Sequence, residues 1–173
     1  MPIEVVEYDP SWPARFEALE RTIREALGAA ALSVDHVGST SVPSLAAKPV
    51  IDIDLTVSDP IDEAAYIPAL ERVHFALLIR EPGWHEHRCL QIDAPPCNLH
   101  VFGPDCPEVV RHRMFRNWLI AHPEDREFYR RAKLAAAKET TESGGTVTDY
   151  NRHKQPVIRE IYERMFRAQG LLR

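Results

Sequence analysis

Cysteine and glycine are scarce in this chain, which has only 3 cysteines and 7 glycines among 173 residues. Cys89, Cys97 and Cys106 are separated by eight and nine positions, which fits neither a CxxC redox motif nor paired zinc-ligand spacing. Because an odd number of cysteines suits a reducing compartment, we expect free, buried thiols rather than disulfides.

Long apolar runs and an excess of positive charge are also missing. No run approaches the ~18 apolar residues of a membrane span, and MPIEVVEYDP lacks the basic and apolar regions of a signal peptide. The formal net charge of -5 gives no general attraction for nucleic acid or an anionic membrane. We therefore expect a cytoplasmic protein that has neither a membrane nor a nucleic acid as its partner.

The familiar glycine motifs for nucleotides, GxxxxGK[ST] and GxGxxG, do not occur. The chain has instead the run IDIDLTV at 51–57, in which apolar and polar residues alternate strictly. On a strand, this pattern places Asp52 and Asp54 on one face, roughly 6–7 Å apart. At an effective dielectric near 20, two such charges repel by roughly 2–3 kcal/mol. This face is therefore either a half-exposed edge in water or a site for a cation.

Gly38 and Ser39 end a short predicted strand at 33–37, and Asp52 follows after a gap of twelve residues. A glycine lets backbone N–H groups approach a phosphate closely, and a serine hydroxyl adds a donor. Carboxylates on the next strand can then hold Mg²⁺, which bridges the phosphate oxygens. The turn and the aspartate pair together predict a site for a phosphate chain and its metal.

The order of the predicted elements indicates an α+β fold in a single domain over 1–173. Strands and helices mix over 1–104, and the part over 105–173 is all helical and packs against that core. The predicted strands lie at 3–8, 33–37, 50–57, 75–80 and, as a hairpin with a DAPP turn, 87–92 and 97–102. The predicted helices lie at 12–27, capped by Asp9 or Ser11, at 61–73 with a kink or start at Pro68, and at 107–121, 123–139 and 150–169.

Several stretches resemble the GrpB-like family of the nucleotidyltransferase superfamily. They are YDPSWPARF at 8–16, HVGSTSVPSLAAKPVIDI at 36–53, NLHVF at 98–102, FRNWLIAHPEDREFYRRAK at 115–133 and YNRHK at 150–154. The resemblance spans nearly the whole chain and implies the polymerase β-like nucleotidyltransferase fold, a mixed sheet flanked by helices. One departure is Ser44, which stands where the family usually has glycine.

The resemblance further implies a Mg²⁺- or Mn²⁺-dependent transfer of a nucleoside monophosphate from a nucleoside triphosphate to a small-molecule or protein acceptor. Asp52 and Asp54 would bind the metal and, with His100, carry the catalysis. His100 stands where active members have a third carboxylate, and it could ligate a metal or act as a base. The alternative is a nucleotide- or phosphate-binding module without turnover. The implied nucleotide- or phosphate-binding residues are Gly38, Ser39, Thr40, Ser41, Lys48, Arg116, Lys133 and Lys154.

Two other kinds of site stay open at this stage. His85, His87 and Cys89 could share one face of a strand and hold zinc, although no fourth ligand has the right spacing. Ser39, His100 and an aspartate could form a hydrolase triad, although GSTSV is not a GxSxG elbow. Trp12 and Trp118 are interpreted as core or inter-helix packing.

Overall fold

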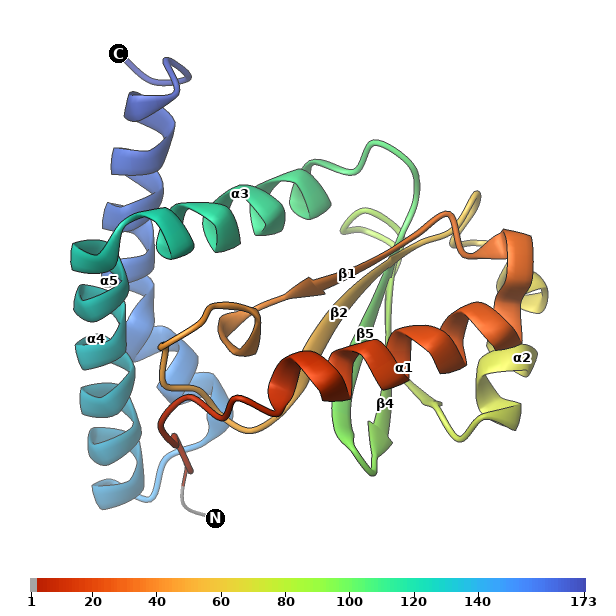
Figure 1. Ribbon diagram of the computed structural model, residues 1–173, viewed down its shortest axis with the longest axis horizontal. Coiled ribbons are helices and arrows are strands. Elements are labelled where there is room, and N and C mark those ends of the chain that lie inside the picture. The colour runs from red at the N-terminus through yellow and green to blue at the C-terminus, as the bar shows by residue number, and fades with distance from the viewer. Residues whose placement is uncertain (1–2) are drawn as a thin grey trace.

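The computed structural model describes residues 3–173 of the chain. Strands and helices are mixed up to β5, and only helices follow, so the predicted α+β class is confirmed (Figure 1). The elements are α1 (Trp12–Leu27), β1 (Ser33–Val37), β2 (Ile51–Thr56), α2 (Ile67–Arg72), β3 (Ala76–Glu81), β4 (His87–Asp93), β5 (Pro96–Phe102), α3 (Pro107–Ala121), α4 (Pro123–Glu142) and α5 (Val147–Ala168). Short 3-10 turns lie at Gly28–Ala30, Ser39–Ser41 and Glu63–Ala65.

The five strands form one mixed sheet in the order β1-β2-β5-β4-β3. β2 runs parallel to β5 and antiparallel to β1, while β4 is antiparallel to both β5 and β3. The predicted hairpin is therefore confirmed as β4 and β5. The register places Asp52 beside Asn98 and Asp54 beside His100, so the polar positions of two neighbouring strands meet.

One face of the sheet is apolar and carries α1 and α2. Ile51, Ile53 and Leu55 of β2 are at most 1% exposed and pack into the same cluster as Ile23 of α1 and Leu70 of α2. Each aliphatic side chain buried in this way contributes about 1.5–3 kcal/mol to folding. The strict alternation of β2 then directs Asp52 and Asp54 to the opposite face, which α3 crosses.

The C-terminal helices stand at one end of the sheet as an antiparallel pair, α4 beside α5, and α3 leads to them (Figure 1). The segment between β1 and β2 joins them to the sheet, because Val42 and Leu45 pack with Leu119, Tyr129 and Ile161 in a second buried cluster. This packing holds the residues just after Gly38 between the sheet and the helices.

The N-terminal run and the helices α2 and α3 differ in part from what the sequence predicts. The run 3–8 is not a strand and makes only an isolated bridge, Val6 to Ala47. On α3 the buried residues are Val109 and Leu119, so Leu119 faces inward as predicted, whereas the predicted inward residue Val110 is 49% exposed. Pro68 lies in the first turn of α2 and marks its start, where the missing N–H costs no hydrogen bond.

The last helix begins earlier than its apolar pattern indicates, at Val147 rather than Tyr150. Thr146 and Asp149 form a capping box, in which each side chain accepts a hydrogen bond from the other's backbone N–H. Ser44 has a positive φ of 67°, a conformation that glycine adopts at a lower cost than serine.

The three cysteines are free and buried, as predicted. Trp12 is fully buried in the core below the sheet, which confirms its packing role. Among the described residues, no helix is both long and apolar enough to cross a bilayer.

Candidate functional site

The turn after β1 lies directly against Asp52. Gly38 has a positive φ of 70°, and a Cβ built on it would lie 2.6 Å from Asp52 Oδ2. Only glycine fits both the backbone conformation and this close approach. The Ser41 hydroxyl donates to the Gly38 carbonyl at 2.5 Å and closes the turn. The predicted meeting of the Gly38–Ser39 turn with the aspartate strand is therefore found in the structure.

Asp52 is held by β5, and its side chain is 33% exposed. Its Oδ1 accepts a hydrogen bond from Asn98 Nδ2 at 3.0 Å and lies 3.8 Å from His100 Nε2. Burial raises the pKa of Asp52, but His100, Asn98 and the charge of Lys48 outweigh it and hold that pKa below its usual value. Asp52 is therefore a carboxylate at neutral pH.

Asp54 is completely buried under α3. Its Oδ2 lies 2.7 Å from His112 Nδ1, and its Oδ1 has no hydrogen-bond partner in the part of the chain that the structure describes. The sequence did not single out His112, because a lone histidine on a helix carries no local signal. Asp54 therefore lines neither of the two cavities that Asp52 lines, whereas His112 lines one of them.

The two aspartates can be compared with what Mg²⁺ requires. Asp52 Oδ2 and Asp54 Oδ1 are carboxylate oxygens without a partner within residues 3–173, and such oxygens are the ligands that Mg²⁺ prefers. No group of three or more His, Cys, Asp or Glu side chains in that range is arranged to hold a metal. The donor set therefore fits Mg²⁺ only if water or phosphate oxygens supply its remaining ligands.

His100 belongs to a chain of hydrogen bonds across the sheet. His100 Nδ1 lies 3.0 Å from His87 Nε2, and His87 Nδ1 lies 2.7 Å from Glu81 Oε2. Burial lowers the pKa of His100, but its partners Asp52 and Cys89 raise that pKa to about 10. A protonated His100 donates to His87 and forms an ion pair with Asp52, and neutral His87 then donates to Glu81.

The raised pKa argues against the predicted role of His100 as a base, because an imidazolium has no lone pair to accept a proton. The hydrolase triad is not supported. It would need a hydrogen bond between Ser39 and His100, but the ring nitrogens of His100 face His87 and Asp52. The zinc hypothesis is not supported either, because His85 is exposed while His87 is buried and bonded to Glu81.

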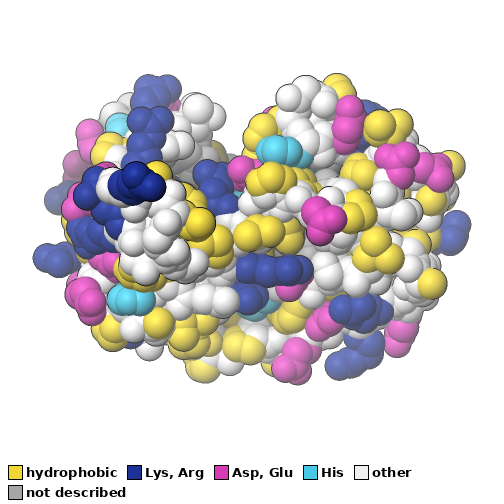
Figure 2. All heavy atoms as spheres, turned by 90° about the horizontal axis from the view of Figure 1, so that it is seen from above, with side chains coloured by type: hydrophobic (Ala, Val, Ile, Leu, Met, Phe, Trp, Pro, Cys, Tyr) yellow, Lys and Arg dark blue, Asp and Glu magenta, His cyan; other side chains and the backbone are white. Residues whose placement is uncertain are grey.

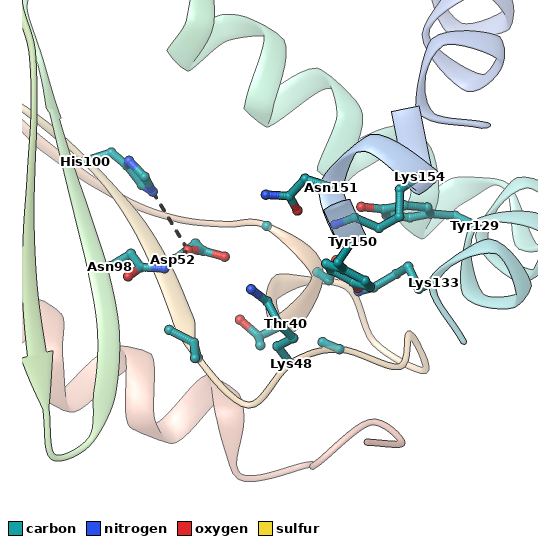
Figure 3. A pocket seen from close by; sticks show the side chains of 14 residues that line it. Thr40, Lys48, Asp52, Asn98, His100, Tyr129, Lys133, Tyr150, Asn151 and Lys154 are labelled. Carbon is teal, nitrogen blue, oxygen red and sulfur yellow. Dashed lines mark hydrogen bonds and ion pairs between the residues drawn. The ribbon is translucent and has the colours of Figure 1, made fainter. Parts of the chain in front are cut away.

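Three lysines from three separate segments line one cavity of about 320 Å³ beside Asp52. Lys48 comes from the connector before β2, Lys133 from α4 and Lys154 from α5. Figure 3 shows Asp52, Asn98 and His100 on the sheet side, with the lysines across from them. We call this space the lysine cavity. Its lining residues are Gly38, Ser39, Thr40, Ala47, Lys48, Val50, Asp52, Asn98, His100, Tyr129, Lys133, Tyr150, Asn151 and Lys154.

The lysines lie close enough to disfavour one another's charge. Burial and the neighbouring Lys154 hold the pKa of Lys133 well below its usual value. Burial and Lys48 lower the pKa of Lys154 to about 8. An anion that entered the cavity would relieve this repulsion, so the cavity is electrostatically prepared for negative charge.

Two tyrosine rings support the lysines. Lys154 Nζ lies 4.1 Å and Lys48 Nζ 5.6 Å from the centre of the Tyr150 ring, and Lys133 Nζ lies 5.2 Å from the centre of the Tyr129 ring. The Tyr150 hydroxyl is buried without a hydrogen-bond partner among the described residues. Neither tyrosine was predicted as a site residue, although Tyr150 opens the YNRHK stretch.

Of the other predicted phosphate-binding residues, Thr40 lies at the lysine cavity, while Ser41 and Arg116 do not. Thr40 lines the lysine cavity, and its hydroxyl lies 2.9 Å from His36 Nε2. Ser41 closes the turn and does not line the cavity. Arg116 also lies apart, because its Nη1 donates to the His36 carbonyl at 2.8 Å and it lines a smaller cavity of about 190 Å³ on the other side of the turn.

The surface is hollowed between the lobe of α4 and α5, on the left in Figure 2, and the lobe of the sheet. Lysine and arginine side chains gather on the helical lobe in this view. The site therefore lies where the two parts of the chain meet.

Known proteins resemble this chain over most of its length. The model of the family described as GrpB protein matches residues 2–164. A UPF0157 protein of Halalkalibacterium halodurans is 45% identical, covering 94% of this chain and 82% of the relative, and one of Streptomyces coelicolor is 35% identical, covering 94% and 83%. The crystal structure of the conserved protein GrpB from Enterococcus faecalis superposes with a TM-score of 0.79 and 27% identity, covering 94% of this chain and 99% of that one. The chain therefore belongs to the GrpB family.

Proposed function

We propose that this protein is a magnesium-dependent nucleotidyltransferase that binds the phosphates of a nucleoside triphosphate in the lysine cavity. The proposal is carried by one observation, the convergence of Lys48, Lys133 and Lys154 on the Gly38 turn beside Asp52. Three lysine amino groups around one carboxylate favour a polyanion, because bound negative charge would stabilise their protonated forms, and the nearby carboxylate oxygens favour the metal that accompanies such an anion. The nucleotidyltransferase-like fold of the family supports the same proposal.

In this proposal the lysines, the glycine turn and the aspartates have separate roles. The lysines bind and orient the phosphate chain, and the glycine turn lets it approach the backbone. Asp52 and Asp54 would hold Mg²⁺, which when bound neutralises charge on the phosphates. An acceptor oxygen or nitrogen forms a bond to the α-phosphorus, and the bond from that phosphorus to pyrophosphate breaks. Pyrophosphate leaves with the bonding electron pair, and the displaced proton of the acceptor passes to water.

A second candidate function is nucleotide or phosphate binding without transfer. It is favoured by His100, which takes the position beside Asp54 where a third carboxylate would complete a two-metal site. A protonated His100 also draws Asp52 into an ion pair, which competes with a metal for that carboxylate. The buried free thiols fit a cytoplasmic location for either function.

The experiment that separates these functions uses α-labelled nucleoside triphosphates, Mg²⁺ or Mn²⁺ and a metabolite extract. We expect labelled product and pyrophosphate from the native protein and from Asp93→Asn, a control at an exposed hairpin aspartate. We expect neither from Asp52→Asn. Transfer that persists in Asp52→Asn contradicts the mechanism. Metal-dependent nucleotide binding without any transfer favours the binding module.

A further inference from the structure

A second cavity of about 440 Å³ lies on the other side of Asp52 from the lysine cavity. The two cavities share Gly38, Asp52 and His100, so both open onto the same carboxylate. The residues that line only the second one come from β1, β3, β4, β5, the β3–β4 turn and α3. We call it the aromatic cavity, and its remaining lining residues are Val37, Ile79, Glu81, Trp84, His87, Cys89, Phe102 and His112.

Its walls are mainly apolar and aromatic. Phe102 and His87 are buried, while Trp84 is 40% exposed and forms an open wall. The Trp84 ring meets His87 at 79° with centroids 5.1 Å apart, and meets Phe102 at 72° and 5.8 Å. These edge-to-face contacts fix the indole as one side of an aromatic corner.

The turn that carries Trp84 is held in an unfavourable backbone conformation. His85 and Glu86 follow one another with positive φ values of 55° and 50°, although neither is glycine. Two hydrogen bonds secure the turn, from Trp84 N to the Glu81 carbonyl and from His87 N to the Trp84 carbonyl, each 3.0 Å. The chain thus places an exposed indole over the sheet at a conformational cost, as is common at binding sites.

The charge of the aromatic cavity is opposite to that of the lysine cavity. Within the described chain it is lined by Asp52 and Glu81 but by no lysine or arginine. Asp52 is paired with His100, so Glu81 supplies the uncompensated negative charge. Glu81 is 47% exposed, and only its Oε2 is engaged by His87. An exposed carboxylate beside an indole face suits an organic cation, through ion pairing and cation–π attraction.

We propose that the aromatic cavity binds the acceptor of the transfer, and that this acceptor is a small organic amine with an aromatic body, held as an ammonium ion by Glu81 and attacking the α-phosphorus through a separate hydroxyl group. The identification as acceptor rests on the proposed function, while the binding site itself stands on its own walls and charge. With phosphates among the lysines and the amine against Trp84 and Glu81, both ligands reach Asp52 from opposite sides. This is the arrangement that an in-line displacement at the α-phosphorus requires.

The test uses three probes with the same phenyl body and different charge: 2-phenylethylamine, 2-phenylethanol and phenylacetate. Binding is followed by the indole N–H signals of the 3 tryptophans, with the Trp84 signal identified by its loss in Trp84→Leu. We expect the amine to shift the Trp84 signal with a Kd of roughly 1 mM, typical for so small a ligand. We expect the acid to bind about tenfold more weakly or not at all.

Variants separate the two contributions. In Glu81→Gln, which keeps an oxygen to accept from His87, the amine should lose its advantage over the alcohol, whereas Glu142→Gln at a remote exposed site should keep it. No shift at Trp84 with any probe at about 10 mM, or acid binding as tight as the amine, would overturn the inference.

The same titration on Lys133→Met distinguishes this inference from the proposed function. We expect amine binding to survive there, because Lys133 does not line the aromatic cavity. Amine binding in a protein that binds no nucleotide would refute the proposed function and leave the amine site standing. Nucleotide binding without amine binding would refute the amine site and leave the proposed function standing.

Discussion

Lys133 places its amino group in a position where only 2% of the residue is exposed and where burial and the neighbouring Lys154 lower its pKa, so its charged form is disfavoured. Burying a charge without a partner is costly, so such a lysine is retained for what it binds rather than for stability. The nearby Tyr129 ring offsets this cost only in part.

Replacing Lys133 by methionine should therefore stabilise the ligand-free protein. We expect Lys133→Met to raise the free energy of unfolding by about 1–2 kcal/mol, because it removes the buried charge and keeps most of the volume. Lys138→Met, at a lysine on the same helix whose side chain is 76% exposed, should change it little. Urea denaturation measures both. A clear loss of stability in Lys133→Met would show that the charge is satisfied within the fold.

Lys154 gives the cavity a pH dependence. Its pKa is lowered to about 8, first by burial and then by Lys48, so it loses its proton within an accessible range. The protonated form attracts anions, hence affinity for a phosphate chain should be highest below pH 8 and fall as the pH rises to 9. Calorimetric titration with inorganic triphosphate at several pH values measures this. Lys154→Met should flatten the decline, and an unchanged slope in that variant would exclude Lys154 as its source.

At the scale of elements, the Gly38 turn is constrained in two ways, by its positive φ and by its contact with Asp52. Gly144 offers a matched comparison, because it has a similar φ of 66° but nothing within 4 Å of a built Cβ. We expect Gly144→Ala to cost about 1 kcal/mol of stability and Gly38→Ala about 2–3 kcal/mol, with loss of triphosphate binding. Thermal unfolding of the two variants measures the difference. Equal costs would mean that the turn can move away from β2 freely.

The start of α5 is a second element-level constraint on the site, since its first turns carry Tyr150 and Lys154. Removing the capping box in Thr146→Ala should cost about 1 kcal/mol and also weaken triphosphate binding, because the first turn would fray. Thr22→Ala is the comparison, as Thr22 lies inside α1 and only donates to the Ala18 carbonyl. If Thr146→Ala loses stability but binds normally, the cap has no influence on the cavity.

At the scale of the whole molecule, the sequence predicted those features that depend on local alternation and turn residues. The β2 strand with its aspartates, the β4–β5 hairpin and the glycine turn follow from patterns within a few residues. The lysine cavity could not be derived in this way, because Lys48, Lys133 and Lys154 come from three segments that meet only after α4 and α5 pack. The resemblance to the family supplied Lys133 and Lys154, and also Arg116, which lines a separate cavity.

The charge state of His100 could not be predicted from the sequence either. The alternation in NLHVF places the histidine on the same face as the aspartates. Its pKa, however, depends on Asp52 in one neighbouring strand and on Cys89 in another, and His87 accepts its hydrogen bond. Similarly, the pairing of Asp54 with His112 joins residues 58 positions apart. Such contacts depend on how distant segments pack, which no local pattern encodes.

We claim that the lysine cavity binds the phosphate chain of a nucleotide, which calorimetric titration with ATP and Mg²⁺ measures. Losing one charged contact of about 1.5–3 kcal/mol should weaken binding roughly 10- to 100-fold in Lys133→Met. Lys138→Met should bind like the native protein. Equal affinity of all three proteins, or no binding to any of the four common nucleoside triphosphates, would contradict the claim.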